Sequence, residues 1–389
     1  MLNGALLLGL LGLLGMTWLF PLLGRAVAWV AERRRASAAL LPGSARVSPR
    51  KVAVLVPAHN EEASLPGSIG SMVRAIRFAS RKFSQVEFVV RVGADGCSDG
   101  SARVARDLGA EVIEFDPNQG KWRTLVELVR ASADADWVVL GDAGIAWPED
   151  FLVNSLPLCA DARTIAVAPT YRNPQAGSIE RVLWAFERHL KSIESAAGGP
   201  VSIHGATVMY RRAELMAALD ELGLAPWLND DVVVPLSLRL LFPQARIRYA
   251  PEVGVHDGGQ EAALAAQGKA PPREFGRRRR MVMGNIQWIR AILPRLWGQS
   301  ATAAVLALRR VFRVFWAYWA LLVGVAALAA ACSLAGNALP VAVAAAGLAA
   351  LMISPLRRSL LGLADAAFAS LSAPYYLLTV RTPERAGWR

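Results

Sequence analysis

The chain has 389 residues, 54% of them hydrophobic, and a formal net charge of +12. So large an apolar fraction excludes an ordinary soluble enzyme, and the apolar residues gather toward the two ends of the chain. The three widely spaced cysteines exclude a disulfide framework and a cysteine-based metal site. The many arginines border apolar segments, which favours an anionic lipid or an anionic substrate over nucleic acid as the partner.

Residues 1–31 are predicted to form an N-terminal transmembrane helix. Their apolar run is long enough to cross about 30 Å of hydrocarbon, and Arg25 is its single charged residue. A signal peptide is the alternative, but no basic region precedes the apolar run. A basic linker at residues 32–50 follows and begins with Glu32-Arg-Arg-Arg35. By the positive-inside rule, these arginines place the next domain in the cytoplasm.

Short apolar runs alternate with helical segments over residues 51–272, which predicts an α/β domain with a mostly parallel sheet. Strands are expected at residues 52–56, 86–92, 112–115, 137–141, 165–168 and 247–250 and around 208, and helices from about 62 and over 122–133, 178–196 and 232–241. Asp142 follows one of these strands directly. Because ligands bind outside the carboxyl ends of strands in such sheets, Asp142 is expected at the mouth of a cleft.

The C-terminal part is basic and then apolar. Residues 273–310 are predicted to form basic helices lying in the membrane interface, since they mix apolar residues with arginine. Residues 311–380 are predicted to form a transmembrane region with two or three spans, at 314–334, at 339–353 and, less clearly, at 360–380. The alternative for residues 360–380 is a hairpin or an interfacial helix that keeps the C-terminus in the cytoplasm, and a basic tail follows over residues 381–389.

Five polar motifs follow one another in the α/β region and precede the basic helices. They are Pro57-Ala-His-Asn-Glu61-Glu62, Ala94-Asp95-Gly-Cys-Ser-Asp99, Asn118-Gln-Gly-Lys121, Asp142-Ala-Gly144 and Asn229-Asp230-Asp231. In this order they resemble a membrane-bound, inverting family 2 glycosyltransferase with a GT-A fold, related to bacterial polysaccharide synthases. The resemblance covers roughly residues 50–300. It implies transfer of a sugar from a nucleotide-diphosphate donor to a lipid-linked or polysaccharide acceptor, in cell-envelope or exopolysaccharide biosynthesis. The site would be the cytoplasmic face of the bacterial inner membrane, in a multi-pass protein.

The resemblance also implies which residues bind the donor. Those expected to contact it are Pro57, Ala58, Glu61, Asp95, Lys121, Asp142, Arg277 and Arg280. Mg²⁺ or Mn²⁺ would lie between Asp142 and the diphosphate, with His256 as a further ligand. Gly144 stands where the family usually has a second acid, so the cation would depend on Asp142, the two phosphates and water.

On the acceptor side, the resemblance implies that His204 and Gly205 floor the site and that Asp231 is the general base, with Asp230 beside it. Two adjacent carboxylates raise each other's pKa, which suits a base. The alternative for this acidic pair is a helix N-terminus, where acids are favoured in any protein. Met281 stands where processive synthases carry a tryptophan after the arginine, which argues against polymerisation through a channel.

A second function belongs to another class of protein. A nucleotide-sugar-binding membrane subunit without catalysis would explain why Gly144 and Ala94 both stand where the family has acids. A nicotinamide dehydrogenase is excluded, because no Gly-x-Gly-x-x-Gly follows the first strand.

Overall fold

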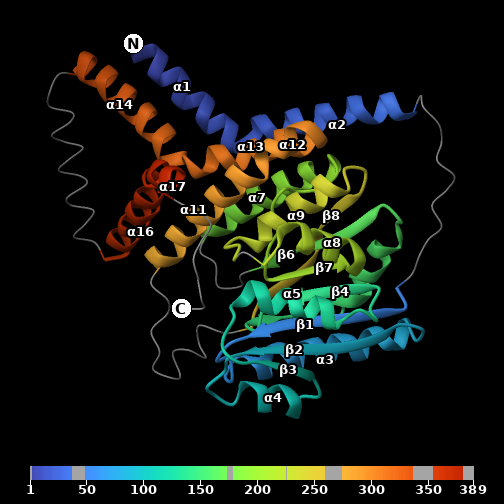
Figure 1. Ribbon diagram of the computed structural model, residues 1–389. Coiled ribbons are helices and arrows are strands. Elements are labelled where there is room, and N and C mark those ends of the chain that lie inside the picture. The colour runs from blue at the N-terminus through green and yellow to red at the C-terminus, as the bar shows by residue number, and fades with distance from the viewer. Residues whose placement is uncertain are drawn as a thin grey trace.

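The computed structural model describes residues 2–36, 49–172, 178–224, 226–258, 274–335 and 354–379. These residues contain one eight-stranded sheet of order β3-β2-β1-β4-β7-β6-β8-β5 (Figure 1). Its strands are β1 Lys51–Ala58, β2 Glu87–Asp95, β3 Glu111–Phe115, β4 Trp137–Gly141, β5 Ile145–Ala146, β6 Thr164–Arg172, β7 Thr207–Arg211 and β8 Arg246–Asp257. The predicted α/β class with a mostly parallel sheet is confirmed.

One half of the sheet is parallel, and its neighbouring strands are β3, β2, β1 and β4. Leu55 of β1 lies opposite Leu140 of β4, so these two strands end side by side. Pro57 and Asp142 therefore reach the same edge of the sheet, as the sequence predicted for strand-end residues.

The strand around residue 208 departs from the parallel arrangement. β7 runs antiparallel to both β4 and β6. β7 therefore begins at the edge where β4 ends, and the loop before β7 lies beside Asp142. The backbone N–H of Asp142 donates to the carbonyl of Ala206 over 3.0 Å. This inversion brings residues 203–206 to the site. The two-residue β5, which pairs with β8, is too short to produce a periodic signal in the sequence.

Helices cover both faces of the sheet, because its central strand is apolar on both sides. Val54 of β1 packs into one hydrophobic cluster with Ile69, and Leu55 packs into the opposite cluster with Leu128, as alternation along a strand requires. The helices of this region are α3 Leu65–Lys82, α4 Ser101–Asp107, α5 Lys121–Ala131, α6 Phe151–Ser155, α7 Ser178–Ala196, α8 Arg212–Leu222 and α9 Asp230–Leu241, and a 3-10 turn η2 spans Leu156–Ala160.

The basic helices after residue 273 were predicted to lie in the membrane interface, and the structure packs part of their surface against the α/β domain. They are α11 Glu274–Ala291, α12 Leu293–Gln299 and α13 Ala301–Val314. Trp288, Leu296 and Leu306 on these helices have no exposed surface and belong to the same hydrophobic cluster as the buried residues of α9. The hydrophobic core of the α/β domain therefore includes side chains beyond residue 272. Contact of the exposed faces with lipid stays a prediction.

Two stretches among the described residues, Asn3–Ala31 and Trp316–Ser333, are long and apolar enough to cross a membrane. The first is divided into α1 Leu2–Leu14, a π-helical turn η1 Gly15–Leu19 and α2 Phe20–Ala36, and the second lies in α14 Trp316–Ala335. α1 lies along α14, whereas α2 turns away to lie along α13 (Figure 1). A Cβ on Gly12 would meet the Trp319 ring at 2.3 Å, so this glycine permits the close approach of α1 and α14.

The last described helices are α16 Ser354–Leu371 and α17 Ala373–Thr379, and both pack against α11. They occupy most of the ambiguous segment predicted at 360–380. The span predicted at 339–353, the tail at 381–389 and most of the linker at 32–50 lie outside the described residues.

Candidate active site

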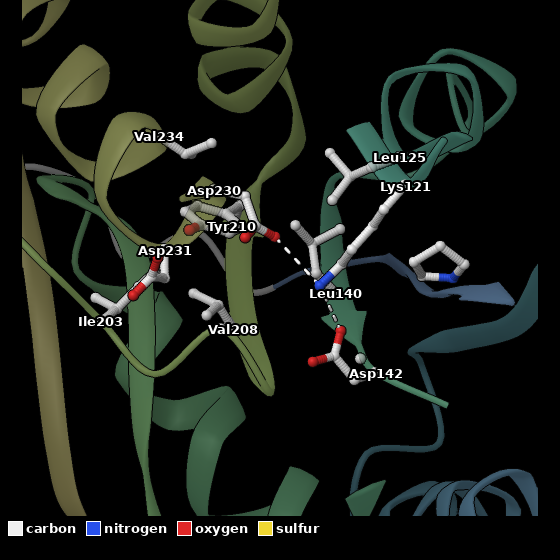
Figure 2. Close-up of a pocket in the computed structure, with 13 residues that line it drawn as sticks. Lys121, Leu125, Leu140, Asp142, Ile203, Val208, Tyr210, Asp230, Asp231 and Val234 are labelled. Atoms are coloured by element: carbon white, nitrogen blue, oxygen red, sulfur yellow. Dashed lines mark hydrogen bonds and ion pairs between the residues drawn. The ribbon is translucent and has the colours of Figure 1, made fainter. Parts of the chain in front are cut away.

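A pocket opens at the edge where β1 and β4 end. It is lined by Pro57, Lys121, Leu125, Leu140, Gly141, Asp142, Ile203, Gly205, Val208, Tyr210, Asp230, Asp231 and Val234 (Figure 2). These residues come from five separate stretches of the chain. The structure thus brings together four of the predicted polar side chains: Lys121 and Asp142 from the donor group, and the acidic pair Asp230 and Asp231.

Lys121 lies at the centre of the polar side of the pocket. It is the first residue of α5 and follows Gly120, whose positive φ of 89° is strained for any residue with a side chain. Its Nζ donates to Asp142 Oδ1 over 2.8 Å and lies 3.4 Å from Asp230 Oδ2. Burial lowers the pKa of Lys121, but the charges of Asp142 and Asp230 outweigh this and raise it. The amine is therefore a permanent cation.

Asp142 extends the end of β4 into the pocket. Burial raises the pKa of its carboxyl group, as does the charge of Asp230, against the opposing effect of Lys121. Its side chain is nevertheless 42% exposed, so the second oxygen faces the open part of the pocket. Lys121 and Asp142 form a fixed ion pair that a phosphate group would approach.

Asp230 and Asp231 are the first two residues of α9 and project in different directions, because consecutive helical residues are about 100° apart. Figure 2 shows Asp230 turned toward Lys121 and Asp231 turned toward Ile203. The Asp231 carbonyl accepts from the N–H of Ile203 over 3.0 Å, which joins the helix start to the loop before β7. The two carboxylates therefore lie on different sides of the pocket.

The pKa of Asp231 is raised, as predicted for this acidic pair. Burial is the largest cause, the charge of Arg310 opposes it, and the charge of Asp230 adds to it. A Cβ built on Gly205 would lie 3.4 Å from the Cβ of Asp231, so a larger side chain at 205 would crowd Asp231.

Helix α11 fixes the start of α9. The Asn229 amide donates to the Met281 carbonyl over 3.0 Å, and Gln287 Oε1 accepts from the N–H of Leu228 over 3.1 Å. A Cβ on Gly284 would lie 2.6 Å from the Asn229 side chain, so this glycine lets the two segments touch. The region that resembles the processive-synthase helix thus positions the acidic pair.

Three of the predicted donor residues make contacts within the protein itself. Ala58 has no exposed surface and packs in the core. Glu61 binds locally, since its carboxylate accepts from Ser64 Oγ. Asp95 is also fully buried, and its two oxygens accept from the N–H groups of Gln119 and Gly120 over 2.7 and 2.8 Å. Asp95 therefore holds the turn that carries Lys121, and its predicted contact with the donor base or ribose stays a prediction.

Other predicted residues lie away from the pocket lining. His204 packs against Trp184, with ring centroids 5.2 Å apart, and burial lowers its pKa to about 2, so it is a neutral member of an aromatic cluster. His256 lies in β8 and pairs with Ala146 of β5. Arg280 is exposed on α11. The side chain of Arg277 lies outside the described part of the chain. Donor contacts of the two arginines stay predictions.

The carboxylates fit a divalent cation only in part. The described residues contain no group of three or more His, Cys, Asp or Glu side chains that could hold a metal ion. Asp142 offers one carboxylate, whose other oxygen already accepts from Lys121. This donor set fits a cation that arrives with a diphosphate and takes most of its ligands from phosphate and water, as Mg²⁺ does.

Sequence reasoning missed Tyr210 and Arg310. Tyr210 lies in the pocket and is 2% exposed, and it belongs to no motif. Arg310 of α13 lies 3.8 Å from Asp231 but is 79 residues away from it in the chain. The signal in the sequence was a group of three arginines, Arg309, Arg310 and Arg313, within a mostly apolar helical segment.

Comparison with known proteins supports the motif resemblance. The sequence profile described as "Glycosyltransferase like family 2" matches residues 49–274, which is more than half of the chain. The chain belongs to this family of glycosyltransferases. It is therefore an enzyme of the transferase class, and its sheet has the GT-A arrangement. No match was found among curated proteins.

Two solved structures of glycosyltransferases are similar to this chain, one of them over nearly its whole length. A mannosyltransferase from Pyrobaculum calidifontis, in complex with GDP-Man and Mn²⁺, is 21% identical, with 96% of this chain and 99% of that chain covered and a TM-score of 0.62. A glucosyl-3-phosphoglycerate synthase from Mycobacterium tuberculosis, in complex with Mn²⁺, UDP and glucosyl-3-phosphoglycerate, is 21% identical over 57% of this chain and 82% of that chain, with a TM-score of 0.37. The first likeness spans the apolar terminal helices as well as the sheet.

Proposed function

We propose that this family 2 glycosyltransferase moves a sugar, with inversion, from a nucleotide-diphosphate donor to a hydroxyl group of its acceptor. One observation carries the proposal: the Lys121–Asp142 pair and Asp231 face the same pocket from two sides (Figure 2). The pair offers a cation for a diphosphate, and Asp231 offers a carboxylate for a hydroxyl proton. A site built in this way has a donor side and an acceptor side.

The reaction needs no covalent intermediate with the enzyme. The acceptor oxygen attacks the anomeric carbon while Asp231 takes the hydroxyl proton, and the bond from that carbon to the diphosphate oxygen breaks. The products are the glycoside and a nucleoside diphosphate. The raised pKa of Asp231 makes it a stronger base than an ordinary aspartate, because proton transfer is most effective when the pKa lies near the working pH.

Charge develops on the leaving diphosphate, and Lys121 is placed to stabilise it. Its Nζ is held between Asp142 and Asp230, so the cation does not need to reorganise when the bond breaks. We expect Mg²⁺ or Mn²⁺, held by Asp142 together with the donor phosphates, to supply further positive charge there. GDP-Man with Mn²⁺ in the Pyrobaculum enzyme supports a donor of this class.

The proposal also covers the acceptor and the location of the enzyme in the cell. We propose a lipid-linked or polysaccharide acceptor at the cytoplasmic face of the bacterial inner membrane, in cell-envelope or exopolysaccharide biosynthesis. The apolar stretches Asn3–Ala31 and Trp316–Ser333 flank the catalytic domain and support contact with membrane lipids. Arg33 to Arg35 directly follow the first of them, which favours a cytoplasmic catalytic domain.

The full chain, purified in detergent or in lipid nanodiscs, tests this function. We expect one nucleotide-diphosphate sugar to raise the melting temperature above all others, because only the bound native state gains from it. That sugar should then release its nucleoside diphosphate when a lipid-linked or glycan acceptor is added with Mn²⁺ or Mg²⁺. Stabilisation without release across acceptors would favour the non-catalytic binding subunit, which Gly144 and Ala94 suggest.

Cation dependence forms a separate prediction. Replacing Gly144 by Asp adds a carboxylate near Asp142, and we expect the Mn²⁺ concentration for half-maximal transfer to fall at least about tenfold, because affinity rises with the number of charged ligands. Titration of Mn²⁺ into chelator-treated protein measures this, with Gly144→Ala as the matched control. Identical titrations for wild type and Gly144→Asp would show that the cation is held elsewhere or is not used.

A further inference from the structure

A buried ionic cluster joins the catalytic domain to α13. Arg309 Nε donates to Glu194 Oε1 over 2.8 Å, and its two Nη atoms donate to the Glu187 carboxylate over 2.9 and 3.2 Å. Arg309 is 3% exposed and Glu194 is fully buried. Removing one member would leave an uncompensated buried charge, so this cluster fixes α13 against α7.

The next residue, Arg310, points toward the pocket. Its Nη2 lies 3.8 Å from Asp231 Oδ2, and its Nε donates to Asn285 Oδ1 over 3.0 Å. The same oxygen accepts from Trp288 Nε1 over 2.9 Å, and Trp288 has no exposed surface. The guanidinium is therefore held in one place by α11. At 3.8 Å it makes an ion pair and no hydrogen bond, so Asp231 keeps its lone pairs for an acceptor proton.

Other ionisable groups also face Asp231. They are Asp230 on α9, Lys121 on α5, Lys191 on α7 and Tyr210 on β7. Lys191 is buried, and burial lowers its pKa to about 8, so its charge fades in mildly alkaline solution. Lys121 is already engaged by two carboxylates. Burial lowers the pKa of Arg310, and the charge of Asp231 opposes this effect. Among these cations, Arg310 is the one that forms an ion pair with Asp231.

We propose that Arg310 is a positioning residue for Asp231: it fixes the carboxylate and supports its negative charge from a helix outside the α/β domain. The inference rests on the proposed function, in which Asp231 is the general base. α13 packs against α2 and runs into α14, which contains one of the apolar stretches long enough to cross a membrane. The base therefore depends on a helix that is seated between the α/β domain and the apolar helices (Figure 1).

The pH profile of kcat/KM tests the proposal on the full-length protein. Asp231 must be ionised to act, so activity is lost as pH falls through its pKa. We call the fall of kcat/KM on the acid side of the profile the acid limb. Because Arg310 lowers the pKa of Asp231, Arg310→Gln should move the acid limb to higher pH by about one unit or more, and Arg310→Lys should move it less. Transfer by Arg310→Gln should then approach the wild-type rate above the shifted limb. A uniform loss at every pH with an unmoved limb would overturn the proposal.

Arg313→Gln is the matched control, because Arg313 lies one turn further along α13 and pairs with Glu187 and not with Asp231. Its acid limb should stay in place. A thermal double-mutant cycle needs no activity: Arg310→Gln should lower the melting temperature less in an Asp231→Asn background than in wild type. Equal losses in both backgrounds would overturn the pairing, even in a chain that transfers no sugar. Absence of transfer by wild type would overturn the proposed function alone.

Discussion

Replacing Asp231 by Asn should lower the rate of sugar transfer by about 10²–10⁴-fold, the usual contribution of a general base. Asn has nearly the same shape and keeps a polar side chain at the start of α9, so the fold should be retained. It cannot take a proton from the acceptor hydroxyl. Because Asp231 points away from the Lys121–Asp142 pair, donor binding should be unchanged (Figure 2). Single-turnover transfer and donor-induced thermal stabilisation measure the two effects separately.

Asp230→Asn is the internal comparison for that variant. Asp230 lies 3.4 Å from Lys121 Nζ, so its loss should change donor binding and leave the acid limb of the pH profile to Asp231. For wild type that limb should lie above the ordinary aspartate pKa, because burial raises the pKa of Asp231. Turnover by Asp231→Asn at the wild-type rate would remove this residue from the role of base.

The sequence predicted the parallel half of the sheet and the pocket edge well. Residues 52–58 of β1 and the whole of β4 are continuous apolar runs, and such runs have few alternatives to a buried parallel strand. The strand ends then place Pro57 and Asp142 together without further information. Lys121 and the acidic pair were predicted through their motifs, and the structure brings them to the same pocket.

The parts that were missed depend on contacts distant in sequence. An apolar helix with arginines has the same pattern whether it lies on lipid or on a protein core, so Trp288 and Leu296 carried no sign of their burial. Asp95 resembles a ligand-binding acid in sequence, yet the N–H groups of Gln119 and Gly120 use its oxygens. His204 was expected at the floor of the acceptor site, and in the structure its ring packs against that of Trp184, which is distant in sequence. Periodicity and motifs do not encode such pairings.

Replacing Lys121 by Met should reduce kcat by about 10²–10³-fold, the cost of removing one preorganised donor from a site of developing negative charge. Met keeps much of the length of the side chain but carries no charge. Donor affinity should fall as well, because Asp142 and Asp230 would then present unpaired carboxylates to the diphosphate. The measurements are kcat from nucleotide release and donor affinity from thermal shift.

Lys121→Arg provides the control, since it retains the positive charge, and it should recover part of the lost rate. A second control, Asp142→Asn in the Lys121→Met background, removes the carboxylate that the lysine pairs with. If repulsion between Asp142 and the diphosphate causes the weaker binding, this double variant should bind the donor better than Lys121→Met alone. Unchanged kcat in Lys121→Met would mean that the leaving diphosphate is stabilised by other cations, and Lys121 would then serve only to hold the two carboxylates of the pocket in place.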